Sequence, residues 1–151
     1  MSILSQIEVT GLRNITKACF SPSPHINLFY GENASGKTTV LEAIHLLSLG
    51  RSFRTQRSRR LIQDNSESAI VFAKLSCGTT IGIQKTLSGE SITQIDRDRA
   101  VRRGELAKVL PLQLFDPSTL EMLSGPSEPR RQLLDWGVFH VEHGFLHLWQ
   151  Q

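Results

Sequence analysis

A glycine-rich segment near the start of the chain constrains its fold more than any other feature. Gly31, Gly36, Lys37 and Thr38 match the spacing G-x-x-x-x-G-K-[ST], in which backbone N–H groups and a lysine surround phosphate oxygens. Glycines suit such a loop because it needs unusual dihedral angles and a close approach of backbone to ligand. The motif requires a strand before the loop and a helix after it, so it predicts an α/β fold with a phosphate site.

The sequence on both sides of this loop has the required character. Residues 26–30 are rich in β-prone side chains and are short enough to form a buried strand. After the loop, Leu41, Ile44 and Leu47 recur at the spacing of one helical face, and Gly50 is a residue type that commonly follows a helix end. Strand, loop and helix are therefore expected in the order that the motif needs.

Each part of the loop has an expected role. Lys37 is expected to neutralise charge on the β and γ phosphates of a nucleotide, and Thr38 to place its hydroxyl on a Mg²⁺ ion. Backbone N–H groups from Asn33 to Thr39 are expected to line the cradle. An ordinary Gly-Ser surface turn with a solvated lysine is the alternative. The predicted nucleotide-binding residues of the loop are Gly31, Glu32, Asn33, Ala34, Ser35, Gly36, Lys37, Thr38 and Thr39.

Composition narrows the class of protein without indicating a function. The 151 residues suffice for one ordinary domain or one lobe of a larger one, and 39% hydrophobic with 21% charged residues is a globular balance. Cys19 and Cys77 lack C-x-x-C spacing, so they predict neither a zinc site nor a redox pair. The start of the chain lacks a signal-peptide pattern, and no run reaches the roughly 20 apolar residues of a membrane span. A cytoplasmic protein without membrane contact is therefore expected.

The remaining sequence predicts a run of hairpins and several helices. Alternating apolar residues, separated by turn residues such as Gly78 and Gly89, indicate strands joined in sequence and hence an antiparallel sheet. Gly11 is expected to end the first strand. The expected strands are residues 3–10, 17–20, 69–75, 80–86, 91–95 and 109–116, and helices are expected around Lys108 and over residues 116–123 and 131–151.

Residues 51–60 form the most basic stretch of the chain. This stretch contains five arginines and no acidic residue, within a chain of net charge +3. Arginines on a loop after the helix can neutralise several phosphates of a nucleic acid, which makes nucleic-acid contact one interpretation of this stretch. A solvated basic face, or arginines paired with acids elsewhere in the fold, is the alternative. The arginines are Arg51, Arg54, Arg57, Arg59 and Arg60.

These motifs follow one another in an order that resembles a known family. The chain is similar to the RecF family of bacterial recombinational repair, within the wider class of SMC-like and ABC-type ATPase heads. Those heads carry a short turn before the phosphate loop and a helix of the LLEAI type after it. The matching stretches are Leu12-Arg13-Asn14, Gly31-Glu32-Asn33, Gly36-Lys37-Thr38, Val40-Leu41-Glu42-Ala43-Ile44, residues 47–55, Leu110-Pro111, Pro129-Arg130-Arg131 and Leu134-Asp135-Trp136.

The resemblance implies a domain organisation and a cofactor set. Residues 1–123, with the phosphate loop at 31–38, would form the ATP-binding first lobe of an ABC-type ATPase head, an α/β lobe with an antiparallel subsheet. Residues 124–151 would begin a helical second lobe. ATP and Mg²⁺ are the cofactors that such a head implies.

The resemblance also assigns residues around the loop. Arg13 and Asn14 would lie near the nucleotide, and Asn33 would help to hold the shape of the loop. Gln113 would take the part of the glutamine that senses the γ phosphate in ABC-type heads. Ala34 stands where these heads usually carry glycine, so the loop backbone must accept a Cβ at this position.

The function implied by the resemblance is recombinational DNA repair and replication. Proteins of this family bind ATP and DNA, recognise duplexes that contain single-strand gaps or junctions, and dimerise around ATP. They work with RecO and RecR to place RecA recombinase on single-stranded gaps, and they take part in the SOS response.

Two motifs of complete ATPase heads are not found in this sequence, namely a Ser-Gly-Gly-Gln-like signature and an apolar strand that ends in Asp-Glu. We therefore expect a fragment that binds nucleotide without hydrolysing it, and no catalytic residue is predicted. Two other classes stay open. One is a self-contained small P-loop kinase or GTPase with Asp116 as the magnesium-holding acid, and the other is a noncatalytic DNA-binding module.

Overall fold

The computed structural model describes residues 3–99, 103–116, 125 and 127–142. The chain divides into two compact units, one ending at Leu110 and the other starting at Pro111. The boundary predicted between residues 123 and 124 lies outside the described residues and stays a prediction. Each unit is described by itself below.

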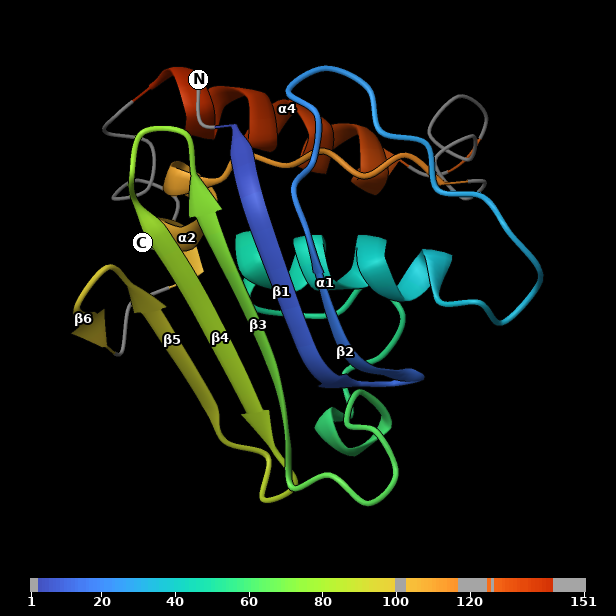
Figure 1. Ribbon diagram of the computed structural model, residues 1–151. Helices are drawn as coiled ribbons and strands as arrows, with labels where there is room; N and C mark the ends of the chain where they lie inside the picture. The colour runs from blue at the N-terminus through green and yellow to red at the C-terminus, as the bar shows by residue number, and fades with distance from the viewer. Residues whose placement is uncertain (1–2, 100–102, 117–124, 126, 143–151) are drawn as a thin grey trace. The chain divides into compact units, whose positions relative to one another are not determined.

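The first unit is built on one six-stranded sheet in the order β2-β1-β3-β4-β5-β6 (Figure 1). Every neighbouring pair is antiparallel, so the predicted run of hairpins is confirmed. The strands are β1 (Leu4–Leu12), β2 (Ile15–Phe20), β3 (Ser68–Leu75), β4 (Thr80–Thr86), β5 (Ser91–Ile95) and β6 (Asp98–Arg99).

Alternation of side chains along the strands places one face of the sheet in the core. On β3, every second residue from Ala69 to Leu75 is buried and the residues between them are exposed, as expected for a period of two. The strand register aligns Val9, Val71 and Ile83 in one buried row across β1, β3 and β4. The core therefore lies on the face of the sheet that carries these residues.

A single long helix, α1 (Lys37–Leu49), lies across this face (Figure 1). It ends as predicted at Gly50, whose left-handed backbone (φ 65°) allows its N–H to donate to the Leu46 carbonyl at 2.8 Å. The predicted apolar face is only partly right, because Leu41 is 44% exposed. The buried face instead includes Glu42, which is completely shielded from solvent.

Two short elements also occur in the described part of the first unit. The helix α2 (Arg103–Val109) confirms the helix predicted around Lys108, and it packs beside α1 through the buried Leu106. A 3₁₀ turn, η1 (Ser58–Arg60), interrupts the stretch between α1 and β3.

The described part of the second unit contains the helix α4 (Ser127–Val141). It begins before the predicted residue 131, because Pro129 falls within the first turn, where a missing N–H breaks no helical hydrogen bond. Trp136 donates its indole N–H to the Leu112 carbonyl at 3.0 Å and so fixes the helix to the segment at the start of this unit. The rest of the predicted helix, and the helix predicted over residues 116–123, lie outside the described residues.

Two predicted strands are wrong. Residues 26–30 adopt no strand, and Ile26, Leu28 and Tyr30 are each more than four-fifths exposed. Within the described part of the chain no strand pairs with them, and an extended stretch without a pairing neighbour cannot build a ladder. Residues 111–116 are also irregular, and Pro111 lacks the N–H that a ladder position needs.

None of the helices in the described ranges is long and apolar enough to cross a membrane.

The strand β1 passes Gly11 and continues to Leu12, contrary to the prediction that Gly11 ends it. A Cβ added at Gly11 would lie 2.6 Å from the Ser68 carbonyl oxygen, and the backbone there is left-handed (φ +64°). Gly11→Ala is therefore expected to lower the free energy of unfolding by about 3 kcal/mol, because the neighbouring backbone must shift. Urea denaturation measures this loss.

Gly89→Ala is the matched control for that measurement. Gly89 also has a left-handed backbone (φ +90°), but a Cβ added there meets no atom within 4 Å. Its expected cost is about 1 kcal/mol, from the backbone conformation alone. Equal losses for the two variants would contradict the close approach at Gly11.

Candidate nucleotide-binding site and basic segment

The phosphate loop owes its shape to left-handed or otherwise unusual backbone angles. The φ angles are 141° at Gly31, 64° at Ala34 and 99° at Gly36. The Ser35 N–H donates to the Glu32 carbonyl at 3.3 Å and closes a turn within the loop. Ala34 therefore has a left-handed backbone at a position where these heads usually carry glycine. Because Ala34 carries a Cβ, this backbone conformation is strained.

Lys37 folds back over this loop. Its ammonium donates to the Gly31 carbonyl at 2.9 Å and to the Glu32 carbonyl at 2.7 Å. The charged ammonium of Lys37 therefore lies at the loop, where the motif predicts that phosphate oxygens bind.

The helix α1 begins at the loop with its first N–H groups uncapped. Gly36 is the N-cap and offers no side-chain hydrogen bond, and no acidic side chain lies in the first turn. The first helical bond runs from the Val40 N–H to the Gly36 carbonyl at 3.0 Å, so the preceding N–H groups have no partner within the helix. This end of the helix carries partial positive charge and suits an anion.

Thr38 is exposed in this first turn, so its hydroxyl is accessible for the predicted role beside Mg²⁺. No group of three or more His, Cys, Asp or Glu residues that could hold a metal by itself occurs among the described residues. The donor set fits a magnesium ion that arrives with a nucleotide, because Mg²⁺ uses few protein ligands together with phosphate oxygens.

Asn14, on the turn between β1 and β2, lies directly against the loop. Its side-chain N–H donates to the Ala34 carbonyl at 2.7 Å, and its oxygen accepts from the Thr39 hydroxyl at 2.9 Å. Asn14 therefore joins the phosphate loop to the first turn of α1. The predicted position of Asn14 near the nucleotide stays a prediction.

Arg13 is engaged in the protein rather than at the loop. Its guanidinium forms a two-pronged ion pair with the carboxylate of Glu42, with Nη2 to Oε1 at 2.8 Å and Nε to Oε2, and Nη1 donates to the Arg60 carbonyl at 3.1 Å. Removing one partner of such a buried pair costs about 3–5 kcal/mol. Sequence reasoning passed over Glu42, although its position one turn after Thr39 places both residues on one face of α1.

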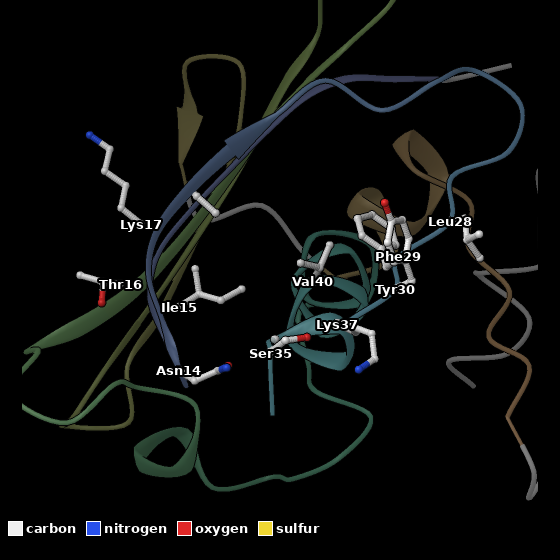
Figure 2. Close-up of a pocket in the computed structure, with 12 residues that line it drawn as sticks. Asn14, Ile15, Thr16, Lys17, Leu28, Phe29, Tyr30, Ser35, Lys37 and Val40 are labelled. Carbon is white, nitrogen blue, oxygen red and sulfur yellow. The ribbon is translucent and has the colours of Figure 1, made fainter. Parts of the chain in front are cut away.

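A pocket of about 570 Å³ opens beside the loop. Figure 2 shows residues of β2 on one side of it and residues 28–30 on the other, with Ser35, Lys37 and Val40 between them. Phe29 is held by an edge contact with Phe20, with ring centroids 5.8 Å apart. The lining residues are Asn14, Ile15, Thr16, Lys17, Ala18, Leu28, Phe29, Tyr30, Ser35, Gly36, Lys37 and Val40.

The pocket combines two kinds of surface. Lys37 and the loop offer positive charge, whereas Ile15, Leu28 and Val40 offer apolar contact. Its volume lies within the range of about 300–1,000 Å³ that is usual for small-molecule sites. A ligand with a phosphate end and a flat, partly apolar end matches this lining.

Residues 51–60, here called the basic segment, are fixed to the fold at their start. The buried Lys85 of β4 donates to the Gly50 carbonyl at 2.9 Å, where its charge also complements the C-terminal end of α1. His45 donates through Nδ1 to the Arg51 carbonyl at 2.7 Å, and Phe53 makes an edge contact with the His45 ring at 5.2 Å. Burial lowers the pKa of His45, against the opposing effect of this hydrogen bond.

The residues just after the basic segment are fixed to β1 and to the turn that follows it. The Arg13 N–H donates to the Leu61 carbonyl at 2.7 Å, and the Gln63 N–H donates to the Gly11 carbonyl at 2.9 Å. Anchored at both ends, the basic segment projects its arginines from the fold. All five, namely Arg51, Arg54, Arg57, Arg59 and Arg60, are exposed.

The sequence left open that these arginines form ion pairs with acidic residues elsewhere in the fold. One of the five does so. Arg54 lies 3.7 Å from the Glu42 carboxylate. For the other four, the described part of the chain provides no ion pair. Their charge is therefore available to an external polyanion.

The phosphate loop, the uncapped helix and the antiparallel sheet together are the features of an ATPase head of mixed α/β architecture. The model of the RecF/RecN/SMC N terminal domain matches residues 3–126, and the chain belongs to this family. Within it, the chain is a homologue of the RecF proteins.

One relative is the DNA replication and repair protein RecF of Acinetobacter baylyi, which is 45% identical over 147 residues. That match covers 97% of this chain and 41% of the relative, so the chain spans about two fifths of the length of the curated protein it matches. A solved structure, described as the recombination mediator protein RecF-ATP in the RecFOR pathway, matches with a TM-score of 0.81 and 27% identity, over 97% of this chain and 40% of that chain.

A more distant likeness extends the fold to SMC heads. A structure from a study of ATP-driven dimerization and DNA stimulated activation of SMC ATPases gives a TM-score of 0.73 at 20% identity. It covers 89% of this chain and 98% of that chain. This likeness shows a shared head fold.

The strain at Ala34 generates a prediction. Ala34→Gly removes the Cβ from a residue with a left-handed backbone and so relieves strain in the folded state. This stabilisation is larger than the entropic cost that glycine adds by making the unfolded chain more flexible. The free energy of unfolding is expected to rise by about 0.5 kcal/mol. Paired urea denaturation of the variant and the parent chain measures it.

Ala43→Gly tests the same substitution at a helical position. Ala43 is buried within α1, so there the change is expected to lower the free energy of unfolding by about 1 kcal/mol or more. Losses of equal size at both positions would show that Ala34 is not strained.

Proposed function

We propose that this chain binds ATP with Mg²⁺ at the phosphate loop. The observation that carries the proposal is the loop itself, in which Lys37 and the uncapped start of α1 converge beside a pocket of about 570 Å³. The loop, the helix end and the pocket provide, in one place, the charge for phosphates and the apolar surface for the nucleoside.

The loop residues divide the work of binding. Lys37 leaves the Gly31 and Glu32 carbonyls to meet phosphate oxygens, and the first N–H groups of α1 donate to the same oxygens. Thr38 supplies a hydroxyl ligand to Mg²⁺, which, when bound, neutralises charge on the β and γ phosphates. Asn14 holds the loop in place through Ala34 and Thr39.

We propose in addition that the basic segment binds the phosphate backbone of DNA. Its five arginines are exposed, and both ends of the segment are fixed to the fold. Anchoring of the segment's backbone near both ends favours contact with successive phosphates, because less backbone freedom is lost on binding.

The wider role that we propose is the one of the RecF relatives. The chain acts as the ATP- and DNA-binding part of a RecF-like protein in recombinational repair and replication in the cytoplasm. It recognises duplex DNA with single-strand gaps or junctions, dimerises around ATP, and works with RecO and RecR to place RecA during the SOS response. The similarity to RecF proteins over almost the whole chain supports this proposal.

Nucleotide binding is tested by Lys37→Ala. The loss of a charged hydrogen-bond donor to phosphate is expected to weaken the affinity for Mg-ATP at least about tenfold. Isothermal titration of the purified chain measures the dissociation constant. Lys74→Ala removes the same charge from the exposed face of β3 and is expected to leave the affinity unchanged. Equal affinity in the parent chain and Lys37→Ala would refute the loop as the nucleotide site.

DNA binding is tested by changing Arg54, Arg57 and Arg60 together to alanine. Each phosphate contact contributes about 0.9 to the slope of log affinity against log salt concentration, so losing three lowers the slope by about 2.7. Fluorescence anisotropy with a gapped duplex at several salt concentrations measures it. Replacing the same residues by lysine keeps the charge and is expected to keep the slope. An undiminished slope in the alanine variant would exclude this segment as the DNA surface.

A further inference from the structure

Two buried side chains lie beneath the point where the basic segment leaves α1. We propose that Lys85 and His45 are positioning residues for DNA binding, which fix the path of the basic segment without touching the nucleic acid. This inference rests on the DNA binding proposed above. It adds two residues from the interior to the arginines that display charge on the surface.

The first of these side chains reaches the end of α1 from the sheet. The last turn of α1, which lies within the described residues, contains no basic side chain. The carbonyls at this end lack helical partners and carry partial negative charge, so a cation is favourable there. The Lys85 ammonium, on a residue that is only 7% exposed, donates to the Gly50 carbonyl at 2.9 Å. It also donates to the Ser91 hydroxyl at 2.7 Å, so the sheet is joined to the start of the segment.

The second side chain holds the next carbonyl from the helix itself. His45, which is 6% exposed, donates through Nδ1 to the Arg51 carbonyl at 2.7 Å, six residues further along the chain. Peptide groups are planar, so a held carbonyl fixes the orientation of its whole peptide plane. The planes that carry the Gly50 and Arg51 carbonyls flank the Cα of Arg51. These two hydrogen bonds therefore determine both backbone dihedral angles of Arg51.

Beyond Arg51 the basic segment has an inner side and an outer side. Ser52, Phe53, Thr55 and Ser58 are half-buried, whereas the five arginines of the segment are exposed. The ring of Phe53 makes its edge contact with His45, so the inner side is seated on the same residue that holds the Arg51 carbonyl. A rotation of the backbone at Arg51 would turn the outer side and change the direction in which the arginines project.

Loss of either hydrogen bond is expected to leave a distinctive effect on DNA binding. The arginines and their charges would remain, so the number of phosphate contacts and the dependence on salt would stay the same. The segment would then have to be ordered at the moment of binding, which lowers the affinity. A weaker affinity at every salt concentration, with an unchanged slope, is therefore the effect of a positioning residue.

His45→Leu tests the bond to the Arg51 carbonyl, because leucine is apolar and offers no donor. We expect the affinity for a gapped duplex to fall about fivefold or more at a fixed salt concentration. The slope of log affinity against log salt concentration is expected to change by less than about 0.9, the value of one phosphate contact. Fluorescence anisotropy measures both. His45→Asn can still offer an N–H close to the place of Nδ1 and is the matched control, with an affinity expected within about twofold of the parent chain.

Lys85→Met tests the bond to the Gly50 carbonyl and is expected to have the same effect on affinity and slope. Ser91→Ala is its matched control, because it removes another partner of the same ammonium and leaves the contact with Gly50 in place. That control is expected to bind DNA as the parent chain does. A slope lowered by about 0.9 or more in Lys85→Met would show that Lys85 contacts phosphate, and it would overturn the positioning role of this residue.

Limited proteolysis with trypsin measures the anchoring of the segment without DNA. Cleavage of a folded chain requires local opening, so a segment that is held less firmly is cut faster. Cleavage within residues 51–60, located by mass spectrometry, is expected to be about fivefold or more faster in His45→Leu and Lys85→Met than in the parent chain. Cleavage after Arg130, in the second unit, is the internal reference. An unchanged affinity for Mg-ATP shows that each variant is folded, and if Lys85→Met does not fold, the two His45 variants still decide.

The outcomes separate this inference from the function on which it rests. A parent chain that does not bind the gapped duplex would overturn the proposed DNA binding and the positioning role with it. A parent chain that binds DNA, with the same affinity in His45→Leu and Lys85→Met, would overturn the positioning role alone. Equal losses in His45→Leu and His45→Asn would contradict the assignment of the effect to the hydrogen bond with Arg51.

Discussion

The ion pair between Glu42 and Arg13 is the interaction on which the arrangement of the candidate site depends. It joins the helix after the phosphate loop to the turn between the first two strands, and its carboxylate is fully buried while the Arg13 side chain is partly exposed. If Arg13 were removed, the Glu42 carboxylate would remain buried without its ion-pair partner, and the β1–β2 turn would lose one of its attachments to α1. The loop, the turn and the basic segment are therefore one assembly rather than three neighbouring features.

The antiparallel sheet acts as the base on which this assembly is mounted. The helix α1 is held at its start through Asn14 and Thr39, and at its end through Lys85, so its direction across the sheet is fixed. Because β1 contributes its backbone to the anchoring of residues 61–63, the stretch between α1 and β3 returns to the sheet close to the turn that carries Arg13. The position of the phosphate loop thus depends on the pairing of strands in the sheet.

Local patterns in the sequence predicted most of the fold of the first unit. The hairpins, the phosphate loop and the end of α1 at Gly50 depend on neighbouring residues, so period, turn residues and helix ends were sufficient. The strand expected at residues 26–30 was wrong because a strand exists only with a pairing neighbour, which its own sequence does not contain. Glu42 was passed over for a related reason: a carboxylate is buried only where distant partners meet it, and those partners lie 29 and 10 residues away.

The position of the Lys37 ammonium has a thermodynamic consequence. In the proposed nucleotide complex, Lys37 would give up its two carbonyl contacts on the loop to reach a phosphate, so binding would exchange hydrogen bonds instead of adding them. The favourable enthalpy from this lysine is then small, and its contribution comes mainly from the attraction between opposite charges at close range. In such a loop, the lysine ammonium already has hydrogen-bond partners before a ligand binds. The selectivity of the loop then depends on how much more strongly the ammonium attracts a multiply charged anion than a carbonyl dipole.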